Sequence, residues 1–274
     1  MPDNQPAVHV LDTAVALTPQ ASGSYAGHTS EAYANMVGPF GGTIGATLLN
    51  AVMLHPDRLG DPLTLTVNFA APIADGAFSV LARVMRTNRS TQHWMVELEQ
   101  NGQVAAFATL LTAIRRDTWS ETDADFPLAP PPAQVPQSPA HPRAAWTGCY
   151  EMRFISGMPG QPTEDTGGHP SETRLWIRDQ PPRPLDFLSL AAMCDAFYPR
   201  VLLRRSSWTP AGTVALTTYF HADAAQLAAH GAAPLLGAAR ALRYHKGFFD
   251  QSAEMWTPAG VLVATSHQVV YFKE

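Results

Sequence analysis

The stretch GPFGGTIGATLLNAVML, residues 38–54, decides the fold expected for this chain. A glycine-rich bend at Gly38–Gly42 leads into a run with helical spacing from about Thr43 to Leu54, and His55-Pro56 ends that run. Because the run has few polar positions, the helix must be covered on most of its sides. A curved antiparallel sheet wrapped around the helix would provide that cover, so the stretch predicts an α+β fold.

Segments with strand character follow this helix in quick succession. Alternating and β-branched residues mark the expected strands, and Asn101-Gly102 is a strong hairpin turn. The first half thus consists of one helix, one short strand before it and four strands after it. These strands are expected at residues 22–30, 63–71, 76–86, 93–99 and 104–115.

The second half of the chain repeats this order of elements. Its apolar helix is expected at residues 185–197, before Pro199. Gly102–Ala106 aligns with Gly260–Ala264, and this internal repeat predicts two tandem α+β units. The strands of the second half are expected at residues 150–155, 173–177, 213–221, 235–244, 252–256 and 261–272.

A proline-rich segment, FPLAPPPAQVPQSPAHP at residues 126–142, separates the two halves. Proline fixes φ and lacks an amide donor, so this segment is neither a helix nor a central strand. We therefore expect an N-terminal unit at residues 1–125, a linker at residues 126–146 and a C-terminal unit at residues 147–274.

Composition excludes several classes of function. The chain has 274 residues, of which 46% are hydrophobic and 15% are charged, and its formal net charge is -5. Since no basic patch dominates the sequence, we expect neither nucleic acid nor a membrane as a partner. The 10 His and 2 Cys residues lack the spacing of a metal site, so no metal and no cofactor are expected. The sequence shows no signal segment and no apolar run of transmembrane length, which favours a cytoplasmic protein.

Five short motifs occur in order along the chain, at residues 40–42, 174–178, 194–197, 219–221 and 260–268. Together they resemble the acyl-CoA thioesterase II family of double-hotdog proteins. The resemblance implies a double hotdog, in which each of two tandem units wraps a curved antiparallel sheet around a long helix. It also implies hydrolysis of a fatty acyl-CoA to the free acid and CoA. Family members form dimers or larger assemblies, so a homo-oligomer, a dimer or a dimer of dimers, is expected.

The same resemblance implies three site residues. The family's Asp on the second helix falls on Asp195, its Thr on the following strand falls on Thr213, and its Gln on the last strand falls on Gln268. In the family these residues orient and activate the attacking water. The chain departs from the family beside them, for example at Cys194 and at Ala215, where an acidic residue is often found. These departures bear on the range of substrates.

Physical chemistry supports part of this assignment. Partial burial of Asp195 near the end of an apolar helix would raise its pKa and make it a better base. The neutral amide of Gln268 can orient a water molecule without competing for its proton. Strand alternation points His267 to the opposite face, which argues against this His as the base. Each site residue also has an ordinary structural explanation: a solvated Asp at a helix end, a common strand Thr and an edge Gln.

The repeat provides an internal comparison of the two halves. The first half lacks a carboxylate, a hydroxyl and an amide at the positions that match Asp195, Thr213 and Gln268, respectively. This one-sided distribution is typical of a chain with one chemical site. The first-half positions that match Asp195, Thr213 and Gln268 are Asn50, Pro62 and Leu110.

The remaining candidate residues concern the substrate. The backbone N–H groups of Gly41 and Gly42, where the first helix begins, are candidate donors to the thioester oxygen as it becomes negative. Which half supplies these donors stays open. His245-Lys246 and Arg86–Arg89 are candidate contacts for CoA phosphates or ordinary surface charges.

Two other functions stay open at this point. A non-catalytic acyl-CoA or lipid-binding protein would share the fold and the apolar pocket. A hydratase or dehydratase of enoyl-CoA would favour a His-Asp pair close in sequence near a helix start, and no such pair is evident. Cys194 has no implied partner His, so a small buried Cys is a better interpretation than a nucleophile.

Overall fold

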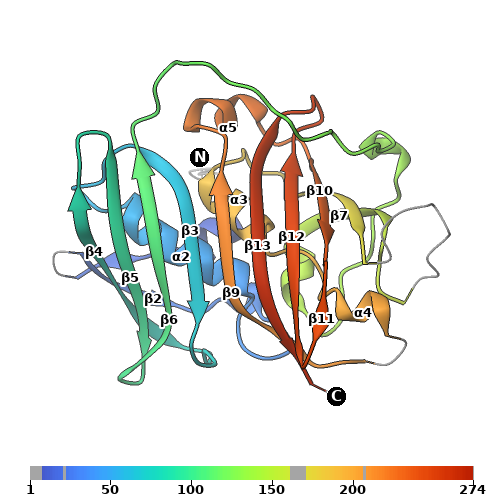
Figure 1. Cartoon of the computed structure of the whole chain (residues 1–274). Helices are drawn as coiled ribbons and strands as arrows, with labels where there is room; N and C mark the ends of the chain where they lie inside the picture. The colour runs from blue at the N-terminus through green and yellow to red at the C-terminus, as the bar shows by residue number, and fades with distance from the viewer. Residues whose placement is uncertain (1–7, 21–22, 161–170, 206–207, 274) are drawn as a thin grey trace, which may run out of the picture.

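The computed structural model describes residues 8–20, 23–160, 171–205 and 208–273, and the strands among them form one sheet (Figure 1). The strands of the first half are β1 (Thr18–Pro19), β2 (Ser24–His28), β3 (Asp61–Phe69), β4 (Ala77–Thr87), β5 (Thr91–Gln100) and β6 (Gln103–Ala113). The strands of the second half are β7 (Tyr150–Ser156), β8 (Thr173–Asp179), β9 (Ala211–Phe220), β10 (Leu235–Arg240), β11 (Tyr244–His245), β12 (Phe248–Trp256) and β13 (Leu262–Phe272). Their order is β1-β2-β4-β5-β6-β3-β9-β13-β12-β10-β8-β7, with β11 paired to β12, and all neighbours are antiparallel.

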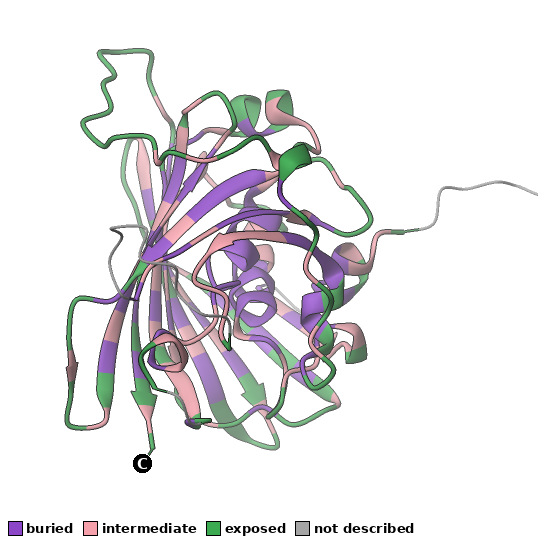
Figure 2. Cartoon of the chain, turned by 90° about the vertical axis from the view of Figure 1, so that its right-hand side faces the viewer, coloured by how far each residue is buried: buried purple, intermediate pink, exposed green. Residues whose placement is uncertain are grey.

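Two helices fill the inside of the curved sheet. Figure 2 shows them at the centre of the molecule, buried along most of their length, with the strands arching around them. The prediction that an apolar helix is covered by an antiparallel sheet is therefore confirmed. No helix in the described part of the chain is long and apolar enough to cross a membrane. The helices are α1 (Val10–Ala14), α2 (Gly41–Met53), α3 (Phe187–Met193), α4 (Val201–Arg204) and α5 (Ala224–His230), with α2 and α3 in the centre.

The two halves of the sheet meet where β3 pairs with β9. The register is symmetrical about this seam: Leu65 lies opposite Thr218, and Val67 lies opposite Leu216. At the centre of symmetry Thr66 lies opposite Thr217, and their hydroxyl oxygens are 3.0 Å apart. The first half therefore contributes to this contact the part of β3 that corresponds to the part of β9 contributed by the second half.

The helix of the second half is shorter than its apolar pattern predicts. Asp186 caps its start by accepting a hydrogen bond from the Ser189 N–H at 2.9 Å. The helix ends at Met193, although apolar residues continue to Phe197. After Met193 the backbone N–H of Asp195 bonds to the carbonyl three residues back, which tightens the last turn. Asp195 thus follows the helix rather than belonging to its last turn.

The expected strand at residues 235–244 is divided in two. β10 ends at Arg240, and β11 contains Tyr244 and His245 alone. The carboxylate of Asp250 accepts hydrogen bonds from the backbone N–H groups of Leu242 and Arg243, at 2.9 to 3.2 Å. A side chain therefore takes the amides that would otherwise continue the strand ladder.

Three short helices, α1, α4 and α5, are not indicated by the apolar pattern. α5 does carry a readable signal, since Asp223 and Gln226 form a capping box. The Asp223 carboxylate accepts from the Gln226 N–H at 2.8 Å, and the Gln226 side chain accepts from the Asp223 N–H at 3.0 Å. These helices are too short for hydrophobic periodicity to identify them.

After β6 the chain, including the proline-rich connector, crosses to the far side of the second half, as the green trace in Figure 1 shows. Its carbonyl groups accept hydrogen bonds from strands of the second half: the Trp176 indole donates to Pro130, and Arg153 donates to Val135. Further along, Trp146 stacks on Phe40 with ring centroids 4.2 Å apart. Apart from a single 3₁₀ turn at Pro132–Gln134, the connector is thus extended, as expected. The side chains that donate hydrogen bonds to it, Trp176 and Arg153, belong to the sheet.

We expect Gly42→Ala to lower the free energy of unfolding by about 1–3 kcal/mol, because an added Cβ would overpack the helix contact. That Cβ would lie 2.5 Å from the backbone oxygen of Ala192 in α3. Gly45→Ala in the same helix is the matched control. Its Cβ would lie 3.6 Å from Val67, an ordinary contact, so this variant should be neutral or more stable by up to about 1 kcal/mol. Urea unfolding of both variants measures the difference, and equal stabilities would contradict the packing argument.

Candidate active site

The structure brings Asp195, Thr213 and Gln268 together inside the second half. The Gln268 Nε2 donates to the Asp195 Oδ1 at 2.8 Å, and the Thr213 hydroxyl donates to the Gln268 Oε1 at 3.1 Å. Asp195 is 9% exposed and Gln268 is 3% exposed. Three side chains from a turn and two strands therefore form one chain of hydrogen bonds in a largely buried space.

Gln268 owes its position to strand alternation in β13. Gln268 and Val270 are buried on the helix side, whereas His267 and Val269 are exposed on the other face. His267 lies instead 3.8 Å from the Asp250 carboxylate. The prediction that His267 points away from Gln268 is confirmed.

A bulge in β9 gives Thr213 its position. Gln268 lies opposite Leu216, but Val270 lies opposite Thr213, so the partner strand has one extra residue between these pairs. Strict alternation would place Thr213 on the face opposite to Leu216. The bulge at Val214 and Ala215 turns Thr213 back toward the helices, where its hydroxyl reaches Gln268.

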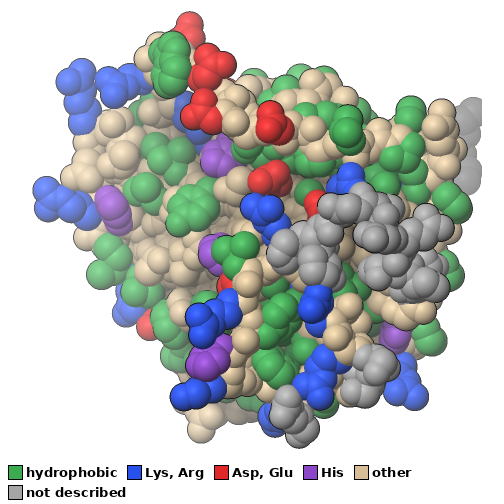
Figure 3. Space-filling model, turned by 45° about the vertical axis from the view of Figure 1, so that its right-hand side comes forward, with side chains coloured by type: hydrophobic (Ala, Val, Ile, Leu, Met, Phe, Trp, Pro, Cys, Tyr) green, Lys and Arg blue, Asp and Glu red, His purple; other side chains and the backbone are tan. Residues whose placement is uncertain are grey.

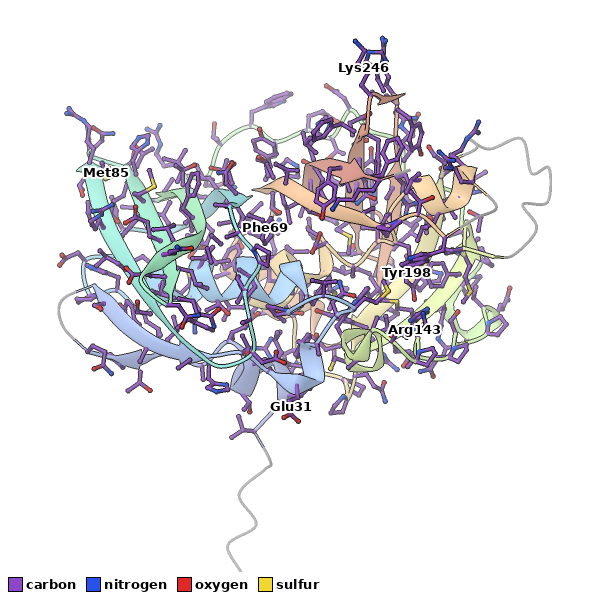
Figure 4. All side chains as sticks on the ribbon, turned by 90° about the horizontal axis from the view of Figure 1, so that it is seen from below. Glu31, Phe69, Met85, Arg143, Tyr198 and Lys246 are labelled. Atoms are coloured by element: carbon purple, nitrogen blue, oxygen red, sulfur yellow. The ribbon has the colours of Figure 1, made fainter. Side chains whose placement is uncertain are left out.

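The N-terminus of α2 contacts Asp195 directly. The backbone N–H of Gly42 hydrogen-bonds to the carboxylate, which also benefits from the positive end of the helix dipole. A Cβ at Gly41 would lie 2.8 Å from the Asp195 Oδ2 and 3.2 Å from the Phe69 ring. Figure 4 labels Phe69 near the middle of the molecule, beside α2. The glycine pair thus leaves room for the carboxylate, and the sequence patterns gave no sign of Phe69 as a neighbour.

Burial raises the pKa of Asp195 to about 7. Loss of hydration is the largest cause, while the hydrogen bonds from Gln268 and from the backbone of Gly42 act in the opposite direction. A carboxyl group with this pKa is partly ionised at neutral pH and can both accept and return a proton. Together with the Gln268 amide, it can orient a water molecule and remove its proton.

The first half lacks this polar set at the corresponding places in the sheet. Pro62 lies opposite Thr112 as Thr213 lies opposite Val270, and Leu110 lies opposite Leu65 as Gln268 lies opposite Leu216. Pro62 and Leu110 are buried apolar residues. The third first-half position is occupied by Asn50, whose amide donates to the Val15 carbonyl at 2.9 Å.

A second buried carboxyl group, Asp179, was not indicated by any sequence pattern. Its pKa is raised to about 6, mainly by burial, and it accepts a hydrogen bond from the Ser189 hydroxyl at 2.6 Å. The negative charges of Asp179 and Asp195 both raise the pKa of the buried Tyr150, although burial is the main cause. The polar interior therefore extends beyond the three predicted residues.

Two further expectations concern cysteine and metals. Cys194 is fully buried, and burial is the main cause that raises its pKa to about 12, as suits a small core residue rather than a nucleophile. Within the described residues, no group of three or more His, Cys, Asp or Glu side chains has an arrangement that could hold a metal ion.

Residues 125–272 match the family described as the acyl-CoA thioesterase C-terminal domain, and residues 30–114 match the acyl-CoA thioesterase N-terminal domain. Among solved structures, the chain is similar to a conserved protein of unknown function with a hot dog fold from Alicyclobacillus acidocaldarius. The two are 45% identical with a TM-score of 0.93, over 98% of this chain and 99% of that chain. No curated protein matches the chain.

Two more distant structures share the fold. One is a candidate thioesterase II from Thermobifida fusca, with 20% identity and a TM-score of 0.80 over 98% of this chain and 99% of that chain. The other is an acyl-CoA thioesterase II from Mycobacterium marinum, with 18% identity and a TM-score of 0.75 over 96% of this chain and 98% of that chain. These likenesses show a hotdog fold.

Asp195→Asn should remove a pH dependence of stability. Between pH 4 and pH 7 the native Asp195 retains a proton that the unfolded chain loses, so the wild type loses stability as the pH rises through this window. As the pH rises through this window, the free energy of unfolding of Asp195→Asn should increase relative to that of the wild type by roughly 4 kcal/mol, at about 1.36 kcal/mol per pKa unit. Asp179 titrates in both proteins, so its effect cancels.

Urea unfolding at several pH values measures this difference. Asp125→Asn, at an exposed position, is the control and should follow the wild type at every pH. If the Asp195→Asn curve ran parallel to the wild type, the raised pKa of Asp195 would be refuted.

Proposed function

Because this chain belongs to the acyl-CoA thioesterase family, we propose that it hydrolyses the thioester of a fatty acyl-CoA to the free acid and CoA. The observation that carries the proposal is the chain of hydrogen bonds from Thr213 through Gln268 to Asp195, beside the N-terminus of α2. This arrangement supplies a buried base of suitable pKa and an amide that fixes its orientation.

In the proposed reaction, Asp195 is the general base. Its carboxylate takes a proton from a water molecule, and the water oxygen attacks the thioester carbonyl carbon. The C–S bond of the tetrahedral intermediate then breaks, and the proton passes from Asp195 to the departing sulfur. The free acid and the CoA thiol leave, and the carboxylate is regenerated.

Gln268 and Thr213 act by holding the base in place. The Thr213 hydroxyl donates to the amide oxygen of Gln268, so the amide nitrogen must face Asp195. With Oδ1 held by this nitrogen, Oδ2 of Asp195 is the oxygen available to a water molecule. Thr213 is thus a positioning residue, and Gln268 orients both the base and the water.

The negative oxygen of the intermediate is stabilised by the start of α2. The first N–H groups of a helix have no partner within the helix. The N–H of Gly42 is engaged by Asp195, so the N–H of Gly41 is the donor that we assign to the substrate oxygen. In this scheme the first half supplies the oxyanion donor, and the second half supplies the base.

The same proposal covers the organisation of the chain. The halves are tandem hotdog units at residues 1–125 and 147–274, joined by the linker at residues 126–146. The symmetrical pairing of β3 with β9 supports this division. So does the absence, at Pro62 and Leu110, of the polar groups found at Thr213 and Gln268. One double-hotdog chain therefore has one site.

We also propose a homo-oligomer, a dimer or a dimer of dimers. Alternate residues of the strands at the centre of the sheet point away from the helices, and several are exposed apolar side chains. Such a surface is typical of one that another subunit covers. Sedimentation of the full chain tests the assembly. The residues concerned include Tyr219, Phe248, Val269 and Tyr271.

Asp195→Asn is expected to lower kcat/KM for acyl-CoA by about 10²–10⁴-fold, the typical contribution of a positioned base. Release of the CoA thiol from a panel of acyl-CoAs, followed with a thiol reagent, measures the rate. His267→Ala is the matched control because it adjoins Gln268 but is exposed on the other face, and it should leave the rate unchanged.

Equal rates for the wild type and Asp195→Asn would rule out this base. If the wild type releases no thiol from any acyl-CoA but shows a thermal shift with them, a non-catalytic binding protein is the better assignment.

The pH profile should report the pKa of Asp195. In the wild type, kcat/KM should rise with pH and level off above about 7, because the base must be ionised. Gln268→Leu removes a hydrogen bond that lowers this pKa, so the rise should move to higher pH. A profile unchanged in Gln268→Leu would show that another group titrates.

A further inference from the structure

A cleft of about 500 Å³ lies at the end of β13, apart from the Asp195 group. Its walls are the end of α4, the hairpin between β11 and β12, and Phe272. A volume of this size is typical of small-molecule sites. Figure 3 shows Lys, Arg and His side chains gathered on the lower part of one face of the molecule. The described residues that line the cleft include Arg204, Arg205, His245 and Lys246. No Asp or Glu is among the described lining residues.

The two lysines of the chain both lie at this end of the molecule. Lys246 lines the cleft, and Lys273 follows Phe272. Lys246 and Gly247 form a two-residue turn between β11 and β12, with φ angles of 47° and 79° respectively. Such turns favour Asn or Gly at the first position, and lysine rarely adopts this conformation.

The charge beneath the cleft is also positive. Arg200 is 0% exposed, and its described partners are backbone carbonyls, the Thr173 hydroxyl and the Gln251 amide oxygen. Burial lowers the pKa of Arg200 to about 9, so the guanidinium remains charged at neutral pH. The nearby carboxylate of Asp250 accepts hydrogen bonds from the backbone N–H groups of residues 242 and 243, and its charge acts on Tyr244, but Arg204, Arg205 and Lys246 outnumber it. The cleft therefore favours an anion.

Aromatic rings form another part of the same wall. Tyr244 and Phe272 line the cleft, and Phe249 lies between them, with ring centroids 5.3 Å from Tyr244 and 6.1 Å from Phe272. Aromatic faces stack on nucleobases, whereas cationic side chains bind phosphates. Both kinds of group in one cleft fit a nucleoside phosphate better than a simple anion.

The distance from the cleft to the proposed site matches the length of the pantetheine arm. Gln268 and Phe272 lie on the same face of β13, roughly 13 Å apart at about 3.3 Å per residue. Pantetheine has about twelve bonds between its sulfur and its phosphate ester, as many as about four residues of extended chain, and so spans roughly 13 Å. Between these points Ala211–Thr213 of β9 are partly exposed.

We propose that this cleft binds the phosphorylated adenosine end of CoA, with Arg204 and Lys246 on the phosphates and Tyr244 beside the adenine ring. The inference rests on the proposed acyl-CoA hydrolysis and names the part of the chain that selects CoA as the thiol carrier. It also gives a reason for a positively charged residue, Lys246, at the first position of this turn.

The test compares two thioesters of the same acyl chain, one on CoA and one on pantetheine, which lacks the nucleotide. Lys246→Ala and Arg204→Ala should each raise KM for acyl-CoA about tenfold, the effect of a lost charged hydrogen bond, and leave kcat unchanged. KM for acyl-pantetheine should not change. Lys246→Arg keeps the charge and should stay near the wild type.

Arg86→Ala tests the other candidate contact for CoA phosphates, and Arg83→Ala, on the same strand and bonded to Glu97 at 2.8 Å, is the matched control. Arg86 lies on β4, which β5, β6, β3 and β9 separate from β13, and its side chain bonds to Asn88 at 2.9 Å. Figure 4 labels Met85, its neighbour, far from Lys246. This arginine is also the alternative candidate for CoA phosphates, so an effect of Arg86→Ala in place of Lys246→Ala would overturn the proposal.

Calorimetry with CoA and with adenosine 3′,5′-bisphosphate separates this proposal from the proposed activity. If no thioester is hydrolysed but Lys246→Ala still weakens both ligands about tenfold, the cleft is correct and the enzyme assignment fails. If wild-type protein binds neither ligand, or if the variants slow acyl-pantetheine equally, the cleft is not a nucleotide site. A third substrate carries the same acyl group on the phosphopantetheine of an acidic carrier protein. If the variants slow hydrolysis of this substrate alone, the cleft is likewise not a nucleotide site.

Discussion

The site depends on how closely the start of α2 approaches the end of α3. A Cβ at Gly42 would lie 2.5 Å from the Ala192 carbonyl oxygen, and one at Gly41 would lie 2.8 Å from the Asp195 carboxylate. This approach closes the core between the two helices and brings the Gly42 N–H to the carboxylate. One packing constraint therefore determines both the contact between the halves and the place of the buried charge.

The broad fold could be predicted from periodicity, because a helix with few polar positions requires cover on most sides. The errors came from interactions that periodicity does not contain. The helix at Phe187–Met193 ends early because its last amides bond to nearer carbonyls. The strand ending at Arg240 is cut short because side chains take the amides that follow it: the Ser171 hydroxyl accepts from Ala241, and the Asp250 carboxylate accepts from Leu242 and Arg243. The first is a local change of hydrogen-bond pattern and the second needs a side chain eight residues away, and hydrophobic periodicity encodes neither.

The three candidate site residues could be named from short motifs, yet their geometry could not be derived from alternation. Alternation places Gln268 on the helix side, and the structure agrees. The same rule places Thr213 on the outer face, and the bulge at Val214 reverses this. The bond from the Gly42 amide to Asp195 joins residues from different halves, and no local pattern in either half encodes it.

The two halves differ in the buried polar groups that they carry, and this difference affects stability. A buried carboxyl group whose pKa is raised to about 7 opposes folding at neutral pH, since the unfolded chain ionises more readily. At the places of Thr213 and Gln268, the first half has Pro62 and Leu110, which add apolar burial without a polar group to satisfy. Both halves share one sheet through β3 and β9, so the apolar half supports the strands that hold the polar set. The shared sheet can thus hold a destabilising buried carboxyl group in one half because the matching positions of the other half carry none.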